Sequence, residues 1–236
     1  MNKMERVIVA LDVDSREKAL SIVKQCAPDI SYFKIGKQLF TAEGPQLVKD
    51  IKSLGVKVFL DLKFHDIPNT VANAVIESAK LGVDMVNIHL SGGSEMVRKT
   101  AEKLNDFFEK NGTKPLLIGV TILTSLDDNA LKEIGYAYNT KEMVKRLALL
   151  GKENGANGVV CSPLEIEIVK EVCGKDFITV TPGIRPEFAL NKDDQKRVMT
   201  PKMAFEKGTD YIVIGRPITK AASIKEAVKK LANELK

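Results

Sequence analysis

Eight short apolar segments recur along the chain, and longer stretches with helical periodicity separate them. The segments are rich in β-branched residues, as β-strands are. Strands that alternate with helices predict right-handed βαβ units and a parallel sheet, and eight such units predict an α/β protein with a closed (β/α)8 barrel of the TIM type. The predicted strands are residues 7–11, 32–35, 58–62, 85–89, 115–122, 158–161, 177–181 and 211–214.

The stretches between these strands carry helix signals. Ser15 is a predicted N-cap, and further helices are predicted over 43–54, 69–81 and 140–154. Since no low-complexity linker interrupts the alternation, residues 1–236 are predicted to form a single domain. An open, doubly wound sheet is the alternative arrangement of the same units. The absence of a GxGxxG sequence after the first strand argues against it.

The third predicted strand is apolar on one face and ionic at the end of the other. Successive strand residues point to opposite faces, so Phe59, Asp61 and Lys63 share a face, while Val58 and Leu62 lie on the opposite, apolar one. Burying a carboxylate and an ammonium costs several kcal/mol per ion unless they pair well. We therefore predict a functional site here; the alternative is a structural ion-pair network that closes the barrel mouth.

Other polar side chains follow the remaining strands. In a barrel of this type the active site lies at the C-terminal ends of the strands, so these side chains are expected to meet at one rim. The candidates, together with Asp61 and Lys63, are Asp12, Lys34, Asp66, Thr124, Ser125 and Pro182. His65 follows the ionic strand out of register with Asp61 and Lys63, which favours a structural role.

The last two strand ends predict a phosphate site. Gly215 lets backbone N–H groups approach an anion, and Arg185 and Arg216 offer forked donors that match phosphate oxygens. The alternative is that both are solvated loop arginines. Residues 186–200 form a long polar stretch, which we interpret as a lid over the phosphate with Gln195 as a further contact.

Composition excludes several classes of protein. The net charge of +5 is spread along the chain, which suits a small anionic ligand better than a nucleic acid. The three cysteines have no CxxC spacing and two histidines are too few for a His-based metal site, so neither a disulfide framework nor a zinc or His-based metal site is predicted. Without a signal-like or membrane-spanning apolar run, a cytoplasmic protein with no membrane partner is expected.

The sequence Asp61-x-Lys63-x-x-Asp66-Ile67-Pro68-x-Thr70 closely resembles the signature of the orotidine 5′-phosphate decarboxylase family. Further matching pieces, spread over almost the whole chain, are Ala10-Leu11-Asp12, Lys34-Ile35-Gly36, Leu123-Thr124-Ser125, residues 180–185, Asp194-Gln195-x-Arg197 and Ile214-Gly215-Arg216. The resemblance implies decarboxylation of orotidine 5′-phosphate to uridine 5′-phosphate in de novo pyrimidine biosynthesis, without metal or cofactor. It also implies a homodimer with its sites at the subunit interface.

The resemblance also implies roles for individual residues. Lys63 would donate the proton, flanked by Asp61 and by the partner subunit's Asp66. The remaining residues would bind substrate, with Asp12, Lys34 and, across the dimer, Thr70 at the ribose, Thr124 and Ser125 at the pyrimidine, and Arg185, Gln195, Gly215 and Arg216 at the phosphate. The alternative role for Thr70 is a helix N-cap.

Three other functions remain open. A magnesium-dependent sugar-phosphate decarboxylase or epimerase would use the carboxylates as metal ligands, although the Lys34 ammonium would oppose a divalent cation. A Schiff-base aldolase would use Lys63 or Lys34, although an amine held between carboxylates stays charged and is a poor nucleophile. A nucleotide-phosphate sensor would bind the same ligand without turnover.

Overall fold

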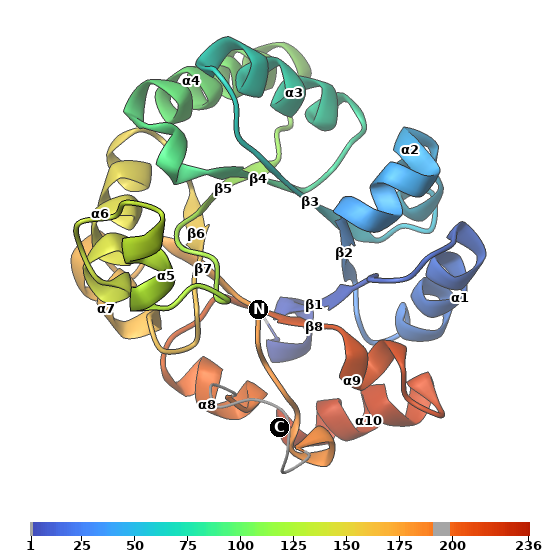
Figure 1. Cartoon of the computed structure of the whole chain (residues 1–236). Helices are drawn as coiled ribbons and strands as arrows, with labels where there is room; N and C mark the ends of the chain where they lie inside the picture. Colours follow the sequence, from blue (N-terminus) through green and yellow to red (C-terminus); the bar gives the residue numbers. More distant parts are fainter. Residues whose placement is uncertain (1, 191–198) are drawn as a thin grey trace.

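The computed structural model describes residues 2–190 and 199–236, and its eight parallel strands close into a barrel in chain order, β1 next to β8. The helices form a ring around this barrel (Figure 1). The closed barrel confirms the predicted fold class and excludes the open sheet. The strands are β1 Val7–Ala10, β2 Tyr32–Gly36, β3 Lys57–Phe64, β4 Met85–His89, β5 Leu116–Val120, β6 Gly158–Val160, β7 Ile178–Thr181 and β8 Tyr211–Ile214.

The helices follow the strands as predicted, with one difference in α2. Ser15 caps α1, its Oγ accepting the Lys18 N–H at 3.4 Å. The predicted helix over 43–54 corresponds to the part of α2 that follows a kink at Gly44, where φ is 66°, and a helical segment from Lys37 that was not predicted precedes the kink. The helices are α1 Arg16–Cys26, α2 Lys37–Lys52, α3 Pro68–Lys80, α4 Ser94–Asn111, α5 Asp128–Glu133, α6 Thr140–Glu153, α7 Ile166–Cys173, α8 Pro201–Glu206, α9 Arg216–Thr219 and α10 Ile224–Glu234, with 3-10 turns η1 Lys3–Arg6, η2 Leu90–Gly92 and η3 Glu187–Ala189.

The core has two layers, one on each face of the sheet. Phe59, Met85 and Val180 belong to the layer inside the barrel. Val58 and Leu60 belong to the larger layer between the sheet and the helices. The alternation predicted for β3 is therefore correct, and the inward face of the strand leads directly to the barrel mouth.

Side chains at the N-terminal end of the barrel fasten neighbouring strands together. Asp84, Asn157 and Asp210 stand just before β4, β6 and β8, and each accepts a backbone N–H of the preceding strand at 2.8 Å. Lys52 pairs with the Asp84 carboxylate at 2.7 Å, and Lys170 pairs with that of Asp210 at 2.6 Å. Since active sites of such barrels lie at the opposite end, these contacts serve stability.

The three cysteines are free and buried, as expected for core thiols. Burial raises the pKa of the Cys26 thiol to about 12, which keeps it protonated at neutral pH. Within the described part of the chain, none of the helices has the length and apolar character needed to cross a bilayer.

Candidate active site

The C-terminal end of β3 is irregular where the ionic residues begin. Leu60 pairs with Val86 on β4 and Phe64 pairs with Ile88, so β3 uses two more residues than β4 over this stretch. Lys63 lies in the bulge with φ of 52°, a left-handed backbone conformation that costs a non-glycine residue about 1–3 kcal/mol. Backbone strain of this kind clusters at functional sites, and here it falls on the candidate proton donor.

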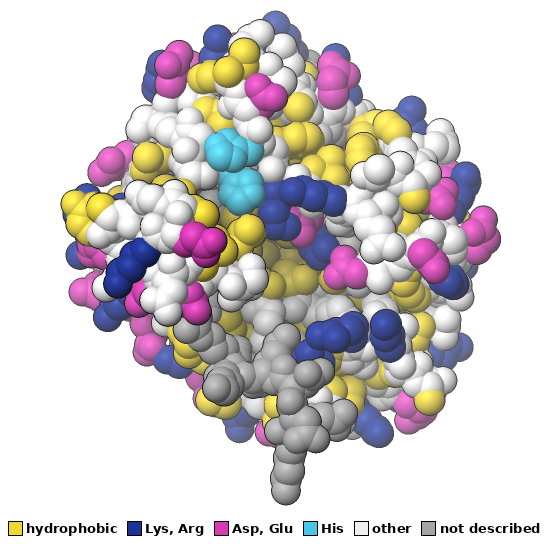
Figure 2. Space-filling model, in the orientation of Figure 1, with side chains coloured by type: hydrophobic (Ala, Val, Ile, Leu, Met, Phe, Trp, Pro, Cys, Tyr) yellow, Lys and Arg dark blue, Asp and Glu magenta, His cyan; other side chains and the backbone are white. Residues whose placement is uncertain are grey.

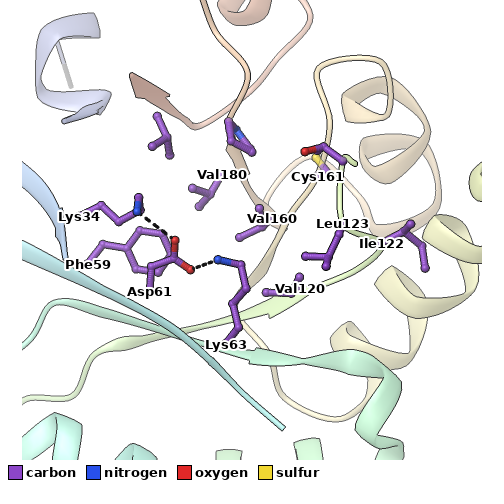
Figure 3. A pocket seen from close by; sticks show the side chains of 13 residues that line it. Lys34, Phe59, Asp61, Lys63, Val120, Ile122, Leu123, Val160, Cys161 and Val180 are labelled. Atoms are coloured by element: carbon purple, nitrogen blue, oxygen red, sulfur yellow. Dashed lines mark hydrogen bonds and ion pairs between the residues drawn. The ribbon is translucent and has the colours of Figure 1, made fainter. Parts of the chain in front are cut away.

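Four side chains, from the loop after β1 and from β2 and β3, form a continuous ionic chain at the barrel mouth. Lys63 Nζ donates to Asp61 Oδ1 at 2.6 Å, and Lys34 Nζ lies 3.3 Å from Asp61 Oδ2. Lys34 Nζ also donates to Asp12 Oδ1 at 3.0 Å. Figure 3 shows both ammonium groups directed at the Asp61 carboxylate. The structure therefore brings together the predicted residues Asp12, Lys34, Asp61 and Lys63.

Asn87 on β4 is part of this cluster and was not predicted. Its Nδ2 donates to Asp61 Oδ1 at 2.7 Å, and its Oδ1 accepts the Lys63 backbone N–H at 2.8 Å. The side chain is completely buried. The sequence held a signal, since an amide in the middle of an otherwise apolar barrel strand needs buried hydrogen-bond partners.

Asp61 is held ionised although it is only 8% exposed. Burial raises the pKa of this carboxyl, but the charges of Lys34 and Lys63 and hydrogen bonds from Lys63 and Asn87 outweigh it, so the net pKa lies below the ordinary value of 3.8. Because its two oxygens already receive two ammonium ions and an amide, this carboxylate is a poor ligand for a divalent cation. Among the described residues, no three His, Cys, Asp or Glu side chains are grouped as metal ligands.

The rings of His65 and His89 lie against each other at the rim of the mouth, with centroids 5.4 Å apart and planes tilted by 36°. They appear in cyan in Figure 2 beside dark-blue basic side chains. Burial lowers the pKa of His89 from 6.5 to about 4, and the positive charges of His65, Lys37 and Lys63 act in the same direction. His89 is therefore neutral at physiological pH.

We expect an NMR titration to find the His89 midpoint near 4, with His65→Gln assigning the signal and moving the midpoint upward. Since the pKa of His89 is lower in the folded than in the unfolded state, His89 of the unfolded state takes up a proton first as pH falls. Stability is then lost as pH falls from about 6.5 to about 4, and His89→Gln should remove this loss. A His89 midpoint near 6.5 would contradict the burial argument.

Two adjoining cavities open at the mouth. The first, of about 200 Å³, has Asp61 and Lys63 on one side and apolar side chains such as Val160 opposite (Figure 3). The second, of about 320 Å³, is lined by Asp12, Gly183, Arg185, Gly215 and Arg216. Lys34, Thr124, Pro182 and Val213 line both. One elongated ligand can thus reach from the ionic chain to the two arginines.

Asp66 and Thr70 do not join the cluster within one chain. Both are exposed at the start of α3, and Asp66 Oδ1 accepts the Ile67 N–H at 2.6 Å. The alternative N-cap role of Thr70 was wrong, because α3 begins at Pro68 and its N-cap is Ile67. Ser125 is exposed in the loop after β5.

The predicted lid falls largely outside the described residues, and Gln195 lies there too. Described residues on either side of this gap are joined, since the Arg185 N–H donates to the Met199 carbonyl at 3.0 Å. Thr200 caps the following helix, with its Oγ1 accepting the Met203 N–H at 3.3 Å. Arg185 is therefore anchored through its backbone at the rim.

A closed barrel with a partly buried ionic chain at its C-terminal mouth and two arginines beside it defines a (β/α)8-barrel enzyme. The model of the orotidine 5′-phosphate decarboxylase / HUMPS family matches residues 5–231. The chain belongs to this family.

Similar proteins cover nearly the whole chain. It is 48% identical to an orotidine 5′-phosphate decarboxylase of Carboxydothermus hydrogenoformans, over 98% of this chain and 96% of the relative. It is 52% identical to that of Pseudoalteromonas translucida, over 93% and 92%. The crystal structure of the enzyme from Lactobacillus acidophilus superposes with a TM-score of 0.86 at 40% identity, over 98% of this chain and 99% of that one.

Proposed function

We propose that this protein is a carbon–carbon lyase that decarboxylates orotidine 5′-phosphate to uridine 5′-phosphate in de novo pyrimidine biosynthesis. Family membership and the relatives' names support the reaction. The observation that carries the proposal is the ammonium of Lys63, held by Asp61 at 2.6 Å on the wall of the smaller cavity. The cytoplasmic location expected from the sequence stays a prediction.

We propose one orientation of the substrate that uses both cavities. Its phosphate would lie between Arg185 and Arg216, where guanidinium groups and the Gly215 backbone offer donors. The ribose hydroxyls would meet Asp12 and Lys34, which are already paired at 3.0 Å. The pyrimidine would then enter the smaller cavity beside Lys63 and Thr124, with Pro182 at the junction.

Lys63 supplies the positive charge and the proton that the reaction needs at the ring carbon. When CO2 leaves, the bonding electron pair stays in an in-plane orbital of ring carbon C6, which the ring cannot delocalise well. An ammonium fixed beside that carbon stabilises the charge as it develops and then transfers a proton from Nζ to C6. The neutral amine regains its proton from water, so the cycle needs no oxidant, metal or cofactor.

Asp61 serves mainly by holding Lys63 charged and in place. Repulsion of the substrate carboxylate by Asp61 is a smaller effect, because like charges 4 Å apart interact by only ~4 kcal/mol at a moderate effective dielectric constant. Enzymes need about 8–23 kcal/mol. Most of the acceleration is therefore assigned to stabilisation of the carbanion, with binding energy from the distant phosphate contributing to orientation.

A homodimer would complete the site. Asp66 and Thr70 are exposed beside Ile67, a large apolar side chain that is 68% exposed at the start of α3. We propose that this surface faces a second copy of the chain, so that the partner subunit's Asp66 approaches Lys63 and the partner subunit's Thr70 approaches the ribose.

The function is tested by following the ultraviolet absorbance of orotidine 5′-phosphate with purified protein and EDTA. We expect full conversion to uridine 5′-phosphate and CO2. Activity that EDTA abolishes and magnesium restores would favour the metal-dependent alternative. Borohydride trapping of a substrate–lysine adduct would favour the aldolase, and tight uridine 5′-phosphate binding without turnover would favour the sensor.

Arg216→Ala is expected to lower kcat/KM for orotidine 5′-phosphate about 10- to 150-fold, because a charge-assisted hydrogen bond contributes about 1.5–3 kcal/mol. The slow reaction of orotidine, which lacks the phosphate, should be unaffected. Arg146→Ala is the control, since Arg146 pairs with Glu142 on the outer helix α6. An unchanged rate with the phosphorylated substrate would exclude a phosphate contact at Arg216.

A further inference from the structure

The bulge in β3 leaves the Lys63 backbone without an ordinary sheet partner. Between the pairs Leu60–Val86 and Phe64–Ile88, three residues of β3 face the single residue Asn87. A backbone N–H buried without a partner costs about 1–3 kcal/mol. The Lys63 N–H finds its acceptor in the Asn87 side chain at 2.8 Å instead of in the β4 backbone.

The other end of the same amide acts on the carboxylate. Asn87 Nδ2 and Lys63 Nζ both donate to Asp61 Oδ1, at 2.7 and 2.6 Å. A completely buried side chain between apolar strand neighbours has little freedom to move. One amide group therefore fixes both the backbone of the candidate proton donor and the oxygen that binds its ammonium.

We propose that Asn87 is a positioning residue for the decarboxylation, holding Lys63 in its left-handed conformation through its carbonyl and orienting the Asp61 carboxylate through its NH₂ group. This inference rests on the proposed function. An asparagine is suited to both tasks because it presents one acceptor and one donor side by side. Aspartate would lack the donor at neutral pH, and an aliphatic residue would lack both.

The test compares Asn87→Ala and Asn87→Asp with wild type. Asn87→Ala removes both hydrogen bonds, and we expect kcat to fall about 10- to 100-fold, the cost of a loosely held catalytic group, with KM for orotidine 5′-phosphate and the affinity for uridine 5′-phosphate nearly unchanged. A residue that only stabilised the fold would lower the unfolding temperature and leave kcat unchanged.

Asn87→Asp adds a signature in the pH profile. The titratable groups near this position are Asp61 and Lys63 on β3, Lys34 beyond Asp61 on β2, and His89 on the same strand as Asn87. Two neighbouring carboxylates cannot both ionise easily, so the introduced one should bind a proton as pH falls. The O–H of the protonated carboxyl group that Asn87→Asp introduces can then donate to Asp61. We therefore expect kcat to rise toward the wild-type value at low pH in Asn87→Asp but not in Asn87→Ala.

Asn157→Ala is the matched control. Asn157 also accepts a strand N–H through its side chain at 2.8 Å, that of Leu117, but at the N-terminal end of the barrel. We expect Asn157→Ala to lower the unfolding temperature and leave kcat unchanged.

The inference would be overturned if both Asn87 variants kept the wild-type kcat. It would also be overturned if kcat fell equally in all three variants and did not rise at low pH in Asn87→Asp. If Asn87→Ala does not fold, the nearly isosteric Asn87→Asp decides alone. Wild-type protein without turnover would instead refute the proposed function, on which the inference depends.

Discussion

Lys63→Ala is expected to abolish decarboxylation, lowering kcat by about 10⁴-fold or more, because the change removes both the proton donor and the charge that stabilises the carbanion. Lys63 is only partly buried at the mouth, so the barrel should remain folded. The measurement is the ultraviolet assay, with circular dichroism to verify the fold. Turnover near the wild-type rate would refute the role assigned to Lys63.

Lys52→Ala is the matched control for this variant. The Lys52 side chain is 28% exposed and 2.7 Å from Asp84, whereas that of Lys63 is 26% exposed and 2.6 Å from Asp61. The two ion pairs thus have the same chemistry at opposite ends of the barrel. We expect Lys52→Ala to lower stability and leave kcat intact.

Asp61→Asn is expected to lower kcat/KM about 10³-fold, the upper end of what the loss of one preorganised electrostatic contact costs in an active site. The variant leaves Lys34 and Lys63 near each other without the anion that separates them, which favours loss of a proton from the donor. Asp210→Asn is the control. Asp210 forms a similar ion pair, with Lys170 at 2.6 Å, but at the opposite end of the barrel from the site. Equal kcat/KM in both variants would contradict the role of Asp61.

Asp61→Asn should also change how the free energy of unfolding depends on pH. The pKa of Asp61 is lower in the folded than in the unfolded state, so its ionic contacts stabilise the fold fully above the unfolded value near 3.8 and are lost as pH falls through the folded value. The difference in unfolding free energy between wild type and Asp61→Asn should therefore be constant near neutral pH and shrink in acid. Denaturant unfolding at several pH values measures it.

The barrel could be predicted because strand and helix signals alternate strictly and leave few topologies open. The inward face of β3 could be predicted from its period of two residues. The start of α2 at Lys37 could not be predicted, because Gly44 and Pro45 suggest a helix boundary where the structure has a kink. The bulge at Lys63 was also missed, since it arises from pairing with β4 and leaves no mark in the β3 sequence.

The candidate site was predictable to the extent that topology brings strand ends together. Asp12 follows β1, Lys34 and Asp61 lie on β2 and β3, and the three side chains meet as expected. Asn87 was missed because its function depends on the bulge opposite it. The roles of Asp66 and Thr70 depend on a second chain, so they stay predictions.

A crystal structure with uridine 5′-phosphate bound tests the central claim most directly. We predict that the phosphate lies between Arg185 and Arg216 and that Lys63 Nζ lies about 3–3.5 Å from ring carbon C6, within reach for proton transfer. A nucleotide bound elsewhere, or one whose C6 faces away from Lys63, would contradict the account.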